Sequence, residues 1–171
     1  MARTHVDFRC VQAGAKRIDL PLGMAITLNG IAQGFITDRI TDLLRNEGFA
    51  QAVVDLGEWR ALGEHPAGRP WRAATRSGLV ELRDNALAVS SGAGTPFEPS
   101  GQFHHIFDPA TGASASTLTE AAVIAPRAMI ADALATAICV TGETRGIQLL
   151  AHYPGVHALV TRASFPATAL T

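Results

Sequence analysis

The sequence predicts an α+β domain in which a mainly antiparallel sheet is flanked by helices. One amphipathic helix lies in the N-terminal third, and two further helical segments lie near the C-terminal end. Short strand-like runs separated by turn residues fill the region between them. Short strands joined by tight turns favour antiparallel pairing. Helices that are segregated from the strands along the chain are typical of the α+β class.

Residues 1–28 are expected to be irregular, with one short strand at Ile18–Leu20. A helix is predicted from Ile31 to Asn46, with Asn29 as its cap and Gly48 at its end. Apolar residues recur along one face of this helix and charged residues along the other, as in an amphipathic helix. The apolar residues of that face are Ile36, Ile40, Leu43 and Leu44.

A series of short strands is predicted after this helix, because apolar and β-branched runs alternate with Gly, Pro and Asn turns. The predicted strands are Ala52–Leu56, Trp59–Leu62, Trp71–Thr75, Leu79–Leu82, Ala86–Ser90, Phe103–Phe107 and Leu118–Ala125. The Gly- and Pro-rich segment 91–101 is predicted to be a loop.

The C-terminal part is predicted to contain two helices and a last strand. A proline opens a helix predicted over Arg127–Val140, and Gly142 ends it. A helix over Thr144–His152 and a strand over Val156–Val160 follow. The tail Phe165–Thr171 is expected to be loose.

The composition is that of an ordinary globular protein. The chain has 171 residues, of which 47% are hydrophobic and 17% charged, so residues 1–171 are expected to form a single domain. The net charge is −1 and no basic cluster stands out, which argues against a nucleic-acid partner. No apolar run is long enough for a membrane-spanning segment, and the first residues show no signal-peptide core.

Asp132 and Thr136 stand out because they lie four residues apart in an otherwise apolar helix. At this spacing both side chains project from one face, and an unpaired buried carboxylate is costly. Carboxylate and hydroxyl oxygens suit Mg²⁺ or Ca²⁺. In the alternative interpretation, Asp132 faces solvent or pairs with an arginine, and Thr136 bonds to a carbonyl of its own helix.

Two other segments contain candidate functional residues. Strand alternation would place His104 and His105 on opposite faces, so that His105 is either a general base near neutral pH or a structural residue. The segment 29–34 places Gly30 and Gly34 at a helix start. There the backbone either meets an ion or allows close packing on a neighbouring helix.

Taken together and in order, four segments resemble the ApbE family, the FAD:protein FMN transferases. The resemblance runs from about Thr27 to Gly142 and implies an ApbE-like, T-fold-like domain. The four segments are Leu28–Phe35 with Asp38, Val54–Glu58, His105–Gly112, and Ile124–Thr136.

The resemblance implies transfer of FMN from FAD to a threonine hydroxyl of an acceptor protein, with release of AMP and with Mg²⁺ on the pyrophosphate. It implies that His105 is the base for the acceptor hydroxyl. The implied metal ligands are a backbone oxygen of Gly30 and the side chains of Asp132 and Thr136. The implied FAD contacts are Thr27, Gln33, Phe107 and Asp108.

The chain departs from the family pattern in several ways. Gln33 stands where the family often has Lys, Thr27 where it has Asp, and Ala135 where some members have a further carboxylate. Family members also carry a sizeable N-terminal portion before the glycine-rich turn. We therefore expect this chain to be the C-terminal portion of a longer family domain, with an exposed surface that self-associates or pairs with the missing N-terminal portion. Family members are often periplasmic or membrane-anchored.

Two other functions stay open at this point. One is a non-catalytic ApbE-like remnant that binds FAD or a partner chain. The other is a Mg²⁺-dependent FAD pyrophosphatase, in which water replaces the acceptor threonine and FMN and AMP are the products.

Overall fold

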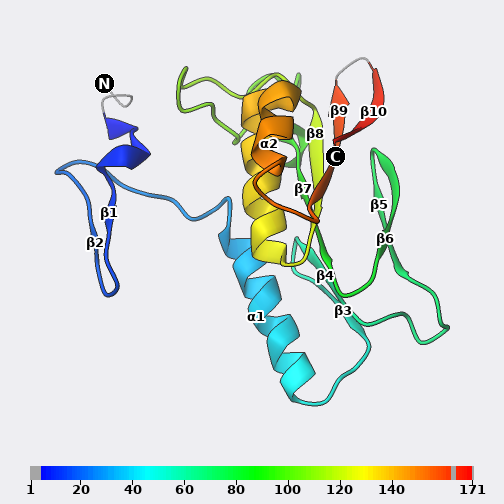
Figure 1. Cartoon of the computed structure of the whole chain (residues 1–171). Helices are drawn as coiled ribbons and strands as arrows, with labels where there is room; N and C mark the ends of the chain where they lie inside the picture. The colour runs from blue at the N-terminus through cyan, green and yellow to red at the C-terminus, as the bar shows by residue number, and fades with distance from the viewer. Residues whose placement is uncertain (1–4, 163–164, 171) are drawn as a thin grey trace.

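The computed structural model describes residues 5–162 and 165–170 and has the predicted α+β architecture. Its main sheet is antiparallel throughout, with the strand order β10-β9-β8-β7-β4-β3. Both helices lie on one face of this sheet, and the hairpin β5–β6 lies on the other (Figure 1). The strands of the main sheet are β3 (Ala52–Asp55), β4 (Trp59–Leu62), β7 (Ala86–Ser90), β8 (Glu120–Ala125), β9 (His157–Arg162) and β10 (Phe165–Leu170). The helices are α1 (Ala32–Asn46) and α2 (Ala128–Leu150), and the hairpin is β5 (Trp71–Thr75) with β6 (Gly78–Leu82).

The N-terminal segment forms a small separate feature. A short 3-10 helix (Phe8–Cys10) leads into the two-residue strands β1 (Gln12–Ala13) and β2 (Ile18–Asp19), which pair with each other. All four strand residues are exposed, and this hairpin projects away from the rest of the chain in Figure 1. The predicted strand at Ile18–Leu20 is therefore present as β2.

Strand β8 is buried on both faces because the sheet separates two hydrophobic clusters. Val123 faces the cluster formed with α2, which includes Ala131 and Ile138. Ala122 faces the opposite cluster, formed with the β5–β6 hairpin. This arrangement explains why the strand has an almost continuous apolar sequence instead of an alternating one.

Helix α1 packs with its small and polar face inward. Its buried residues are Gly34, Thr37, Asp38 and Thr41. A Cβ atom at Gly34 would overlap the carbonyl group of Ala128, so the glycine lets α1 approach the start of α2 closely. Of the apolar face that the sequence pattern identified, Ile36, Ile40 and Leu43 are instead exposed, and Leu44 is half-buried.

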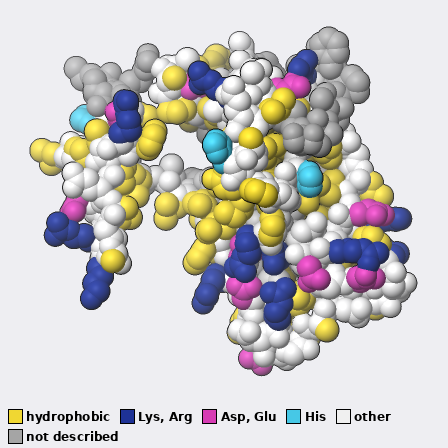
Figure 2. Space-filling model, viewed as in Figure 1, with side chains coloured by type: hydrophobic (Ala, Val, Ile, Leu, Met, Phe, Trp, Pro, Cys, Tyr) yellow, Lys and Arg dark blue, Asp and Glu magenta, His cyan; other side chains and the backbone are white. Residues whose placement is uncertain are grey.

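We call this exposed face the α1 stripe and define it as Phe35, Ile36, Ile40 and Leu43. These side chains are between 39% and 53% exposed. Figure 2 shows hydrophobic side chains gathered around the start of α1. A continuous apolar surface of this kind usually marks a surface that another chain or segment covers.

The ends of the helices differ in detail from the sequence prediction. Asn29 does not cap α1, because the residue at the cap position is Ile31 and the Asn29 N–H donates to the Thr27 hydroxyl. The two helices predicted near the C-terminal end are two parts of α2, which is kinked at Gly142. The backbone of Gly142 is non-helical, with φ of +78° and ψ of 178°, so two helical segments meet at this glycine, as the predicted helix end at Gly142 requires.

The predicted strand Phe103–Phe107 is wrong. Its backbone groups pair partly with side chains and partly with neighbouring loops instead of with a sheet: the Phe103 N–H donates to the Glu98 carboxylate and the His104 N–H to the Ser114 hydroxyl, while the His105 N–H donates to the Thr95 carbonyl. Only isolated bridges form here, between Pro96 and His104 and between Phe107 and Ser114. The segment is an extended loop held by its polar side chains, and the predicted loop 91–101 leads into it.

The expectation that the tail is loose is also wrong for the described part of it. Phe165–Leu170 forms β10, which pairs antiparallel with β9 across a register shift. This pairing satisfies the outer edge of β9, which would otherwise present unpaired backbone groups. Thr171 lies outside the described residues. Within the described residues, no helix has the length and apolar character needed to cross a membrane.

We predict that the chain self-associates through the α1 stripe when no other segment covers it. Changing Ile36 and Leu43 together to lysine should reduce the apparent mass in light scattering. The free energy of unfolding should change by only about 0.5 kcal/mol, since both side chains are half exposed. Leu79→Lys, on the exposed face of β6, is the matched control and should leave association unchanged. A wild-type chain that is monomeric at high concentration would contradict this prediction.

Candidate functional site

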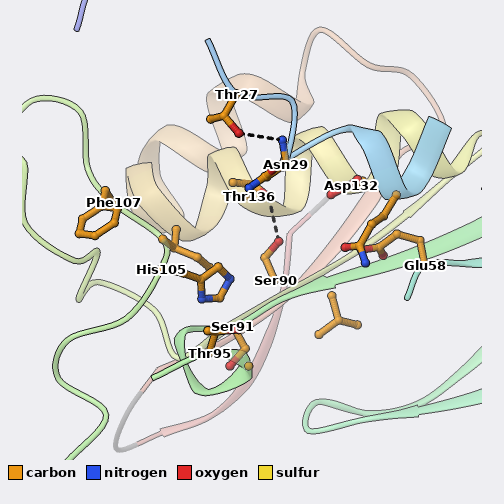
Figure 3. A pocket seen from close by; sticks show the side chains of 15 residues that line it. Thr27, Asn29, Glu58, Ser90, Ser91, Thr95, His105, Phe107, Asp132 and Thr136 are labelled. Atoms are coloured by element: carbon orange, nitrogen blue, oxygen red, sulfur yellow. Dashed lines mark hydrogen bonds between the residues drawn. The ribbon is translucent and has the colours of Figure 1, made fainter. Parts of the chain in front are cut away.

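A pocket of about 390 Å³ opens where the start of α1, the first turns of α2, the end of β7 and the loop before Asp108 meet (Figure 3). It collects residues that are far apart in the sequence. Of the residues predicted from the sequence, it is lined by Thr27, Gly30, Gln33, His105, Phe107, Asp132 and Thr136. Residues to which the sequence analysis gave no role also line it, among them Glu58, Ser90, Ser91 and Thr95.

Asp132 and Thr136 project from α2 toward the glycine-rich turn, as their spacing predicts. The Gly34 N–H donates to Asp132 Oδ2 at 3.0 Å, across 98 residues of sequence. A Cβ atom at Gly30 would lie 3.4 Å from Thr136, whose hydroxyl is 3.1 Å from that of Ser90. Asp132 is 4% exposed and has no arginine partner within the described residues, so the alternative of a solvent-facing or arginine-paired carboxylate does not apply.

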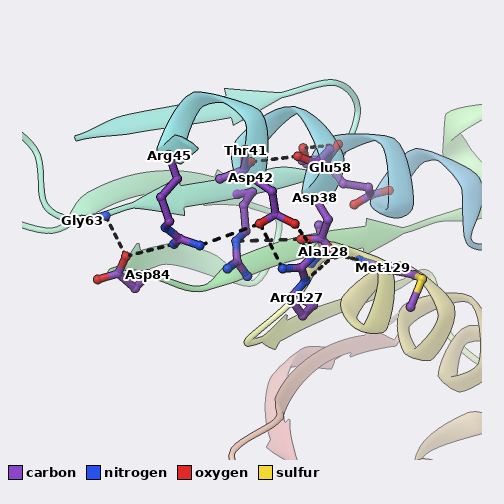
Figure 4. A network of polar contacts seen from close by, with 12 residues as sticks. Asp38, Thr41, Asp42, Arg45, Glu58, Gly63, Asp84, Arg127, Ala128 and Met129 are labelled. Atoms are coloured by element: carbon purple, nitrogen blue, oxygen red, sulfur yellow. Dashed lines mark hydrogen bonds and ion pairs between the residues drawn. The ribbon is translucent and has the colours of Figure 1, made fainter. Parts of the chain in front are cut away.

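A second buried carboxylate, Asp38 of α1, lies on the other side of the helix crossing. Asp38 accepts hydrogen bonds from the N–H groups of Ala128 and Met129, at 2.9 and 3.0 Å. These are the first N–H groups of α2, which have no partner within that helix. The guanidinium groups of Arg127 and Arg60 lie 3.2 and 3.8 Å from the Asp38 carboxylate (Figure 4).

Arg127 of this network also contacts α1 near the surface, through Asp42. Arg127 donates two hydrogen bonds to Asp42, at 3.1 and 2.8 Å, and these bonds hold the pKa of Asp42 below its usual range. Burial lowers the pKa of Arg60. The two helices are therefore joined by Asp38 of α1, by Asp132 of α2, and by the two hydrogen bonds from Arg127 to α1.

Glu58 lies in the turn between β3 and β4 and is 6% exposed. Its carbonyl oxygen accepts a hydrogen bond from the Thr37 hydroxyl, which attaches the turn to α1. Burial and the nearby negative charge of Asp132 raise the pKa of Glu58 to about 8, which a backbone hydrogen bond from Val89 only partly offsets. Burial also raises the pKa of Asp132. The sequence analysis included Glu58 in a family-like segment but gave it no role.

The two adjacent histidines have different environments. His104 is buried, and its ring is used within the loop: Nε2 is 2.8 Å from the Ala115 carbonyl and Nδ1 accepts from the Ile106 N–H. His105 is exposed and lines the pocket. The two rings therefore point into different environments, as predicted, although the backbone here is a loop and not a strand. His105 is the histidine that a ligand can reach.

The predicted FAD contacts do not all lie in the pocket. Thr27, Gln33 and Phe107 line it, and Phe107 is 51% exposed. Asp108 does not line it, and its carboxylate accepts hydrogen bonds from the Ala110 N–H and the Thr111 hydroxyl within its own turn. The structure thus gives Asp108 a role in shaping the turn that follows Phe107.

The charge of the pocket limits what it can bind. Among the described residues that line it there are two carboxylates, Glu58 and Asp132, and no lysine or arginine. Such a surface repels an anionic ligand unless a cation lies between them. The available ligands are carboxylate, hydroxyl and backbone carbonyl oxygens, which are those that Mg²⁺ prefers.

Comparison with known sequences identifies close similarity to one family. A sequence model described as the ApbE family matches residues 1–160. The FAD:protein FMN transferase of Treponema pallidum is 35% identical over 92% of this chain and 51% of its own length. The FAD:protein FMN transferase of Vibrio cholerae is 31% identical over 85% of this chain and 47% of its own length.

Solved structures show the same fold. The apo form of the flavinyl transferase ApbE from Pseudomonas stutzeri has a TM-score of 0.83 and 27% identity, and covers 99% of this chain and 56% of its own. The ApbE protein from Thermotoga maritima has a TM-score of 0.85 and 26% identity, and covers 98% of this chain and 59% of its own. This chain therefore spans about half the length of the relatives that it matches.

We predict that Glu58→Gln flattens the pH dependence of the free energy of unfolding when divalent cations are removed by chelation. Because the folded-state pKa is raised from 4.5 to about 8, the folded chain holds a proton that the unfolded chain releases in this range. Stability from this group is therefore complete below pH 4.5 and is lost as the pH rises through 8. Urea titrations across this range measure the slope.

The exposed Glu47→Gln variant carries the same charge change and should keep the wild-type slope. If Glu58→Gln and the wild-type chain lose stability equally between these pH values, the carboxyl of Glu58 is ionised in the folded state and the prediction is wrong.

Proposed function

The chain belongs to the ApbE family, and on that basis we propose that it acts in Mg²⁺-dependent transfer of FMN from FAD to a threonine hydroxyl of an acceptor protein, releasing AMP. The observation that carries this proposal is the pocket itself. It brings together an exposed histidine, an exposed aromatic ring and three oxygen ligands, contributed by segments from Thr27 to Thr136. Phosphoryl transfer needs both charge neutralisation on oxygen and a base for the incoming hydroxyl.

The residues that would hold Mg²⁺ are Asp132, Thr136 and the backbone of Gly30. The surroundings fit a hard divalent cation, since the pocket is lined by two carboxylates and by no lysine or arginine among the described residues. When bound, the cation would neutralise charge on the pyrophosphate of FAD. Asp132 uses one oxygen to accept from Gly34, and this hydrogen bond fixes the carboxylate in place.

His105 is proposed to accept the proton of the acceptor threonine. In the transfer step, the threonine oxygen forms a bond to the phosphorus of the FMN half. The bond from that phosphorus to the bridging oxygen breaks, and AMP leaves with that oxygen. Phe107, exposed at the rim, would contact the flavin, and Thr27 and Gln33 would contact the dinucleotide without adding charge.

Two alternatives use the same pocket. Because Thr27 and Gln33 are neutral and the chain spans about half of its relatives, it is a candidate for a non-catalytic module that binds FAD or a partner. Because His105 is exposed, water is also a candidate acceptor, which would make the chain a Mg²⁺-dependent FAD pyrophosphatase. We further propose that the chain corresponds to the C-terminal portion of the family domain, and that an N-terminal portion would cover the α1 stripe.

Incubation with FAD, Mg²⁺ and an acceptor domain that carries the target threonine separates these functions. Transfer gives an acceptor whose mass increases by that of FMN less water, together with AMP. The pyrophosphatase gives AMP and FMN without a change in the acceptor. A chain that binds FAD and gives neither product is a binding module, and the proposal would be wrong.

We predict that His105→Ala lowers the rate of transfer by about 10²–10⁴-fold while FAD affinity stays near the wild-type value, since a general base acts in the transition state. Asp132→Asn should abolish the Mg²⁺-dependent transfer, because a neutral oxygen binds this cation more weakly. His157→Ala, an exposed histidine of β9, is the control and should transfer FMN normally. An equal loss of FAD binding in His105→Ala would instead assign His105 to ligand contact.

A further inference from the structure

Glu58 is a carboxylate of the pocket that is not among the proposed Mg²⁺ ligands. Glu58 is 6% exposed, and its Oε2 atom has no hydrogen-bond partner within the described part of the chain. The carboxyl accepts a backbone hydrogen bond from Val89, but this leaves one buried oxygen unpaired, and a buried polar atom without a partner is costly unless a ligand or counter-charge reaches it. Glu58 lines the same pocket as Gly30, Asp132 and Thr136, and Figure 3 shows it at the Asp132 end of that pocket.

No described lysine or arginine side chain compensates the charge of Glu58. The neighbouring Arg60 contacts a different carboxylate, since its guanidinium lies 3.8 Å from Asp38. The side chain of Gln33 closes the pocket beside Glu58: a Cβ atom at Gly57 would lie 2.8 Å from its amide nitrogen. Gln33 is neutral, so among the described residues no positive group offsets an ionised Glu58, and its carboxyl is satisfied either by a proton or by a cation from outside the chain.

The position of Glu58 is fixed by the fold. Its backbone carbonyl accepts from the Thr37 hydroxyl of α1, and Thr37 is fully buried. The turn also has its own hydrogen bond, from the Gly57 N–H to the Asp55 carboxylate. The carboxylate is therefore supplied by a rigid turn of the sheet, whereas Asp132 is supplied by α2.

We propose that Glu58 is a further ligand of the divalent cation, supplied by the β3–β4 turn and facing the helix that provides Asp132 and Thr136. The inference rests on the proposed cation site and adds a residue to it. A second carboxylate strengthens binding of a hard cation, because affinity rises with the number of charged ligands. It also lets the cation connect the sheet to α2.

The test is binding of Mn²⁺ alone, followed by the electron paramagnetic resonance signal of the free ion, with no FAD present. Glu58→Gln keeps the size and polarity of the side chain and removes its charge, and should weaken Mn²⁺ affinity by about tenfold or more. Asp132→Asn should weaken it as well. Glu47→Gln, which changes an exposed carboxylate outside the pocket, should bind like the wild-type chain.

Thermal unfolding with and without Mn²⁺ separates ligand loss from misfolding. Without the ion, Glu58→Gln should melt at the wild-type temperature or above it, because it replaces a buried ionisable group by a neutral one of the same size. With the ion, it should gain less stability than the wild-type chain, since the gain follows RT ln(1 + [L]/Kd). A variant that folds, yet loses the cation-dependent gain, supports the inference.

Two results overturn it in different ways. If Asp132→Asn loses Mn²⁺ and Glu58→Gln keeps it, Glu58 is a neutral hydrogen-bond donor in the pocket, and only the inference fails. If the wild-type chain binds no Mn²⁺ at millimolar concentration, the proposed cation site fails and the inference fails with it.

Discussion

Each of the two helices supplies a carboxylate that accepts hydrogen bonds from the first turn of the other. Asp38 of α1 accepts from the first N–H groups of α2, and Asp132 of α2 accepts from the Gly34 N–H in the first turn of α1. N–H groups at a helix start have no partner within the helix and favour negative charge. Gly34 allows the two helices to approach closely enough for these hydrogen bonds, because any larger residue at this position would collide with Ala128. The pocket lies at this crossing, so its walls depend on it.

This crossing places one buried acidic residue, Asp132, both at the contact between the helices and in the pocket. Asp132 is held by one hydrogen bond on the α1 side, and it also lines the pocket with Glu58. Glu58 is attached to the same helix through Thr37. The two carboxylates are thus fixed independently of any ligand, in a pocket without lysine or arginine among its described residues. A preorganised pair of carboxylates suits a divalent cation, and the cation in turn would make the pocket suitable for a pyrophosphate.

Much of the fold could be predicted from local sequence, because strands and turns leave short-range signals. Turn residues separate β3 to β7 correctly, and the apolar run of β8 reflects a strand covered on both faces. The positions of Asp132 and Thr136 follow from helix spacing alone. The orientation of α1 could not be predicted, since its apolar face resembles a core face and only the partner helix shows that the small residues are buried. The role of Glu58 could not be predicted either, because it depends on the approach of a turn to a helix far along the chain.

If this pocket accepts a pyrophosphate only together with a divalent cation, as we propose, FAD binding should depend on that cation. FAD should be titrated into the chain by flavin fluorescence, once with Mg²⁺ and once with a chelator. FAD affinity should fall by about tenfold or more when the cation is removed, as expected for an anion that meets an acidic pocket without a cation between them. Equal affinity in the two titrations would mean that no cation acts between the pocket and the pyrophosphate, and the proposed cation site would be wrong.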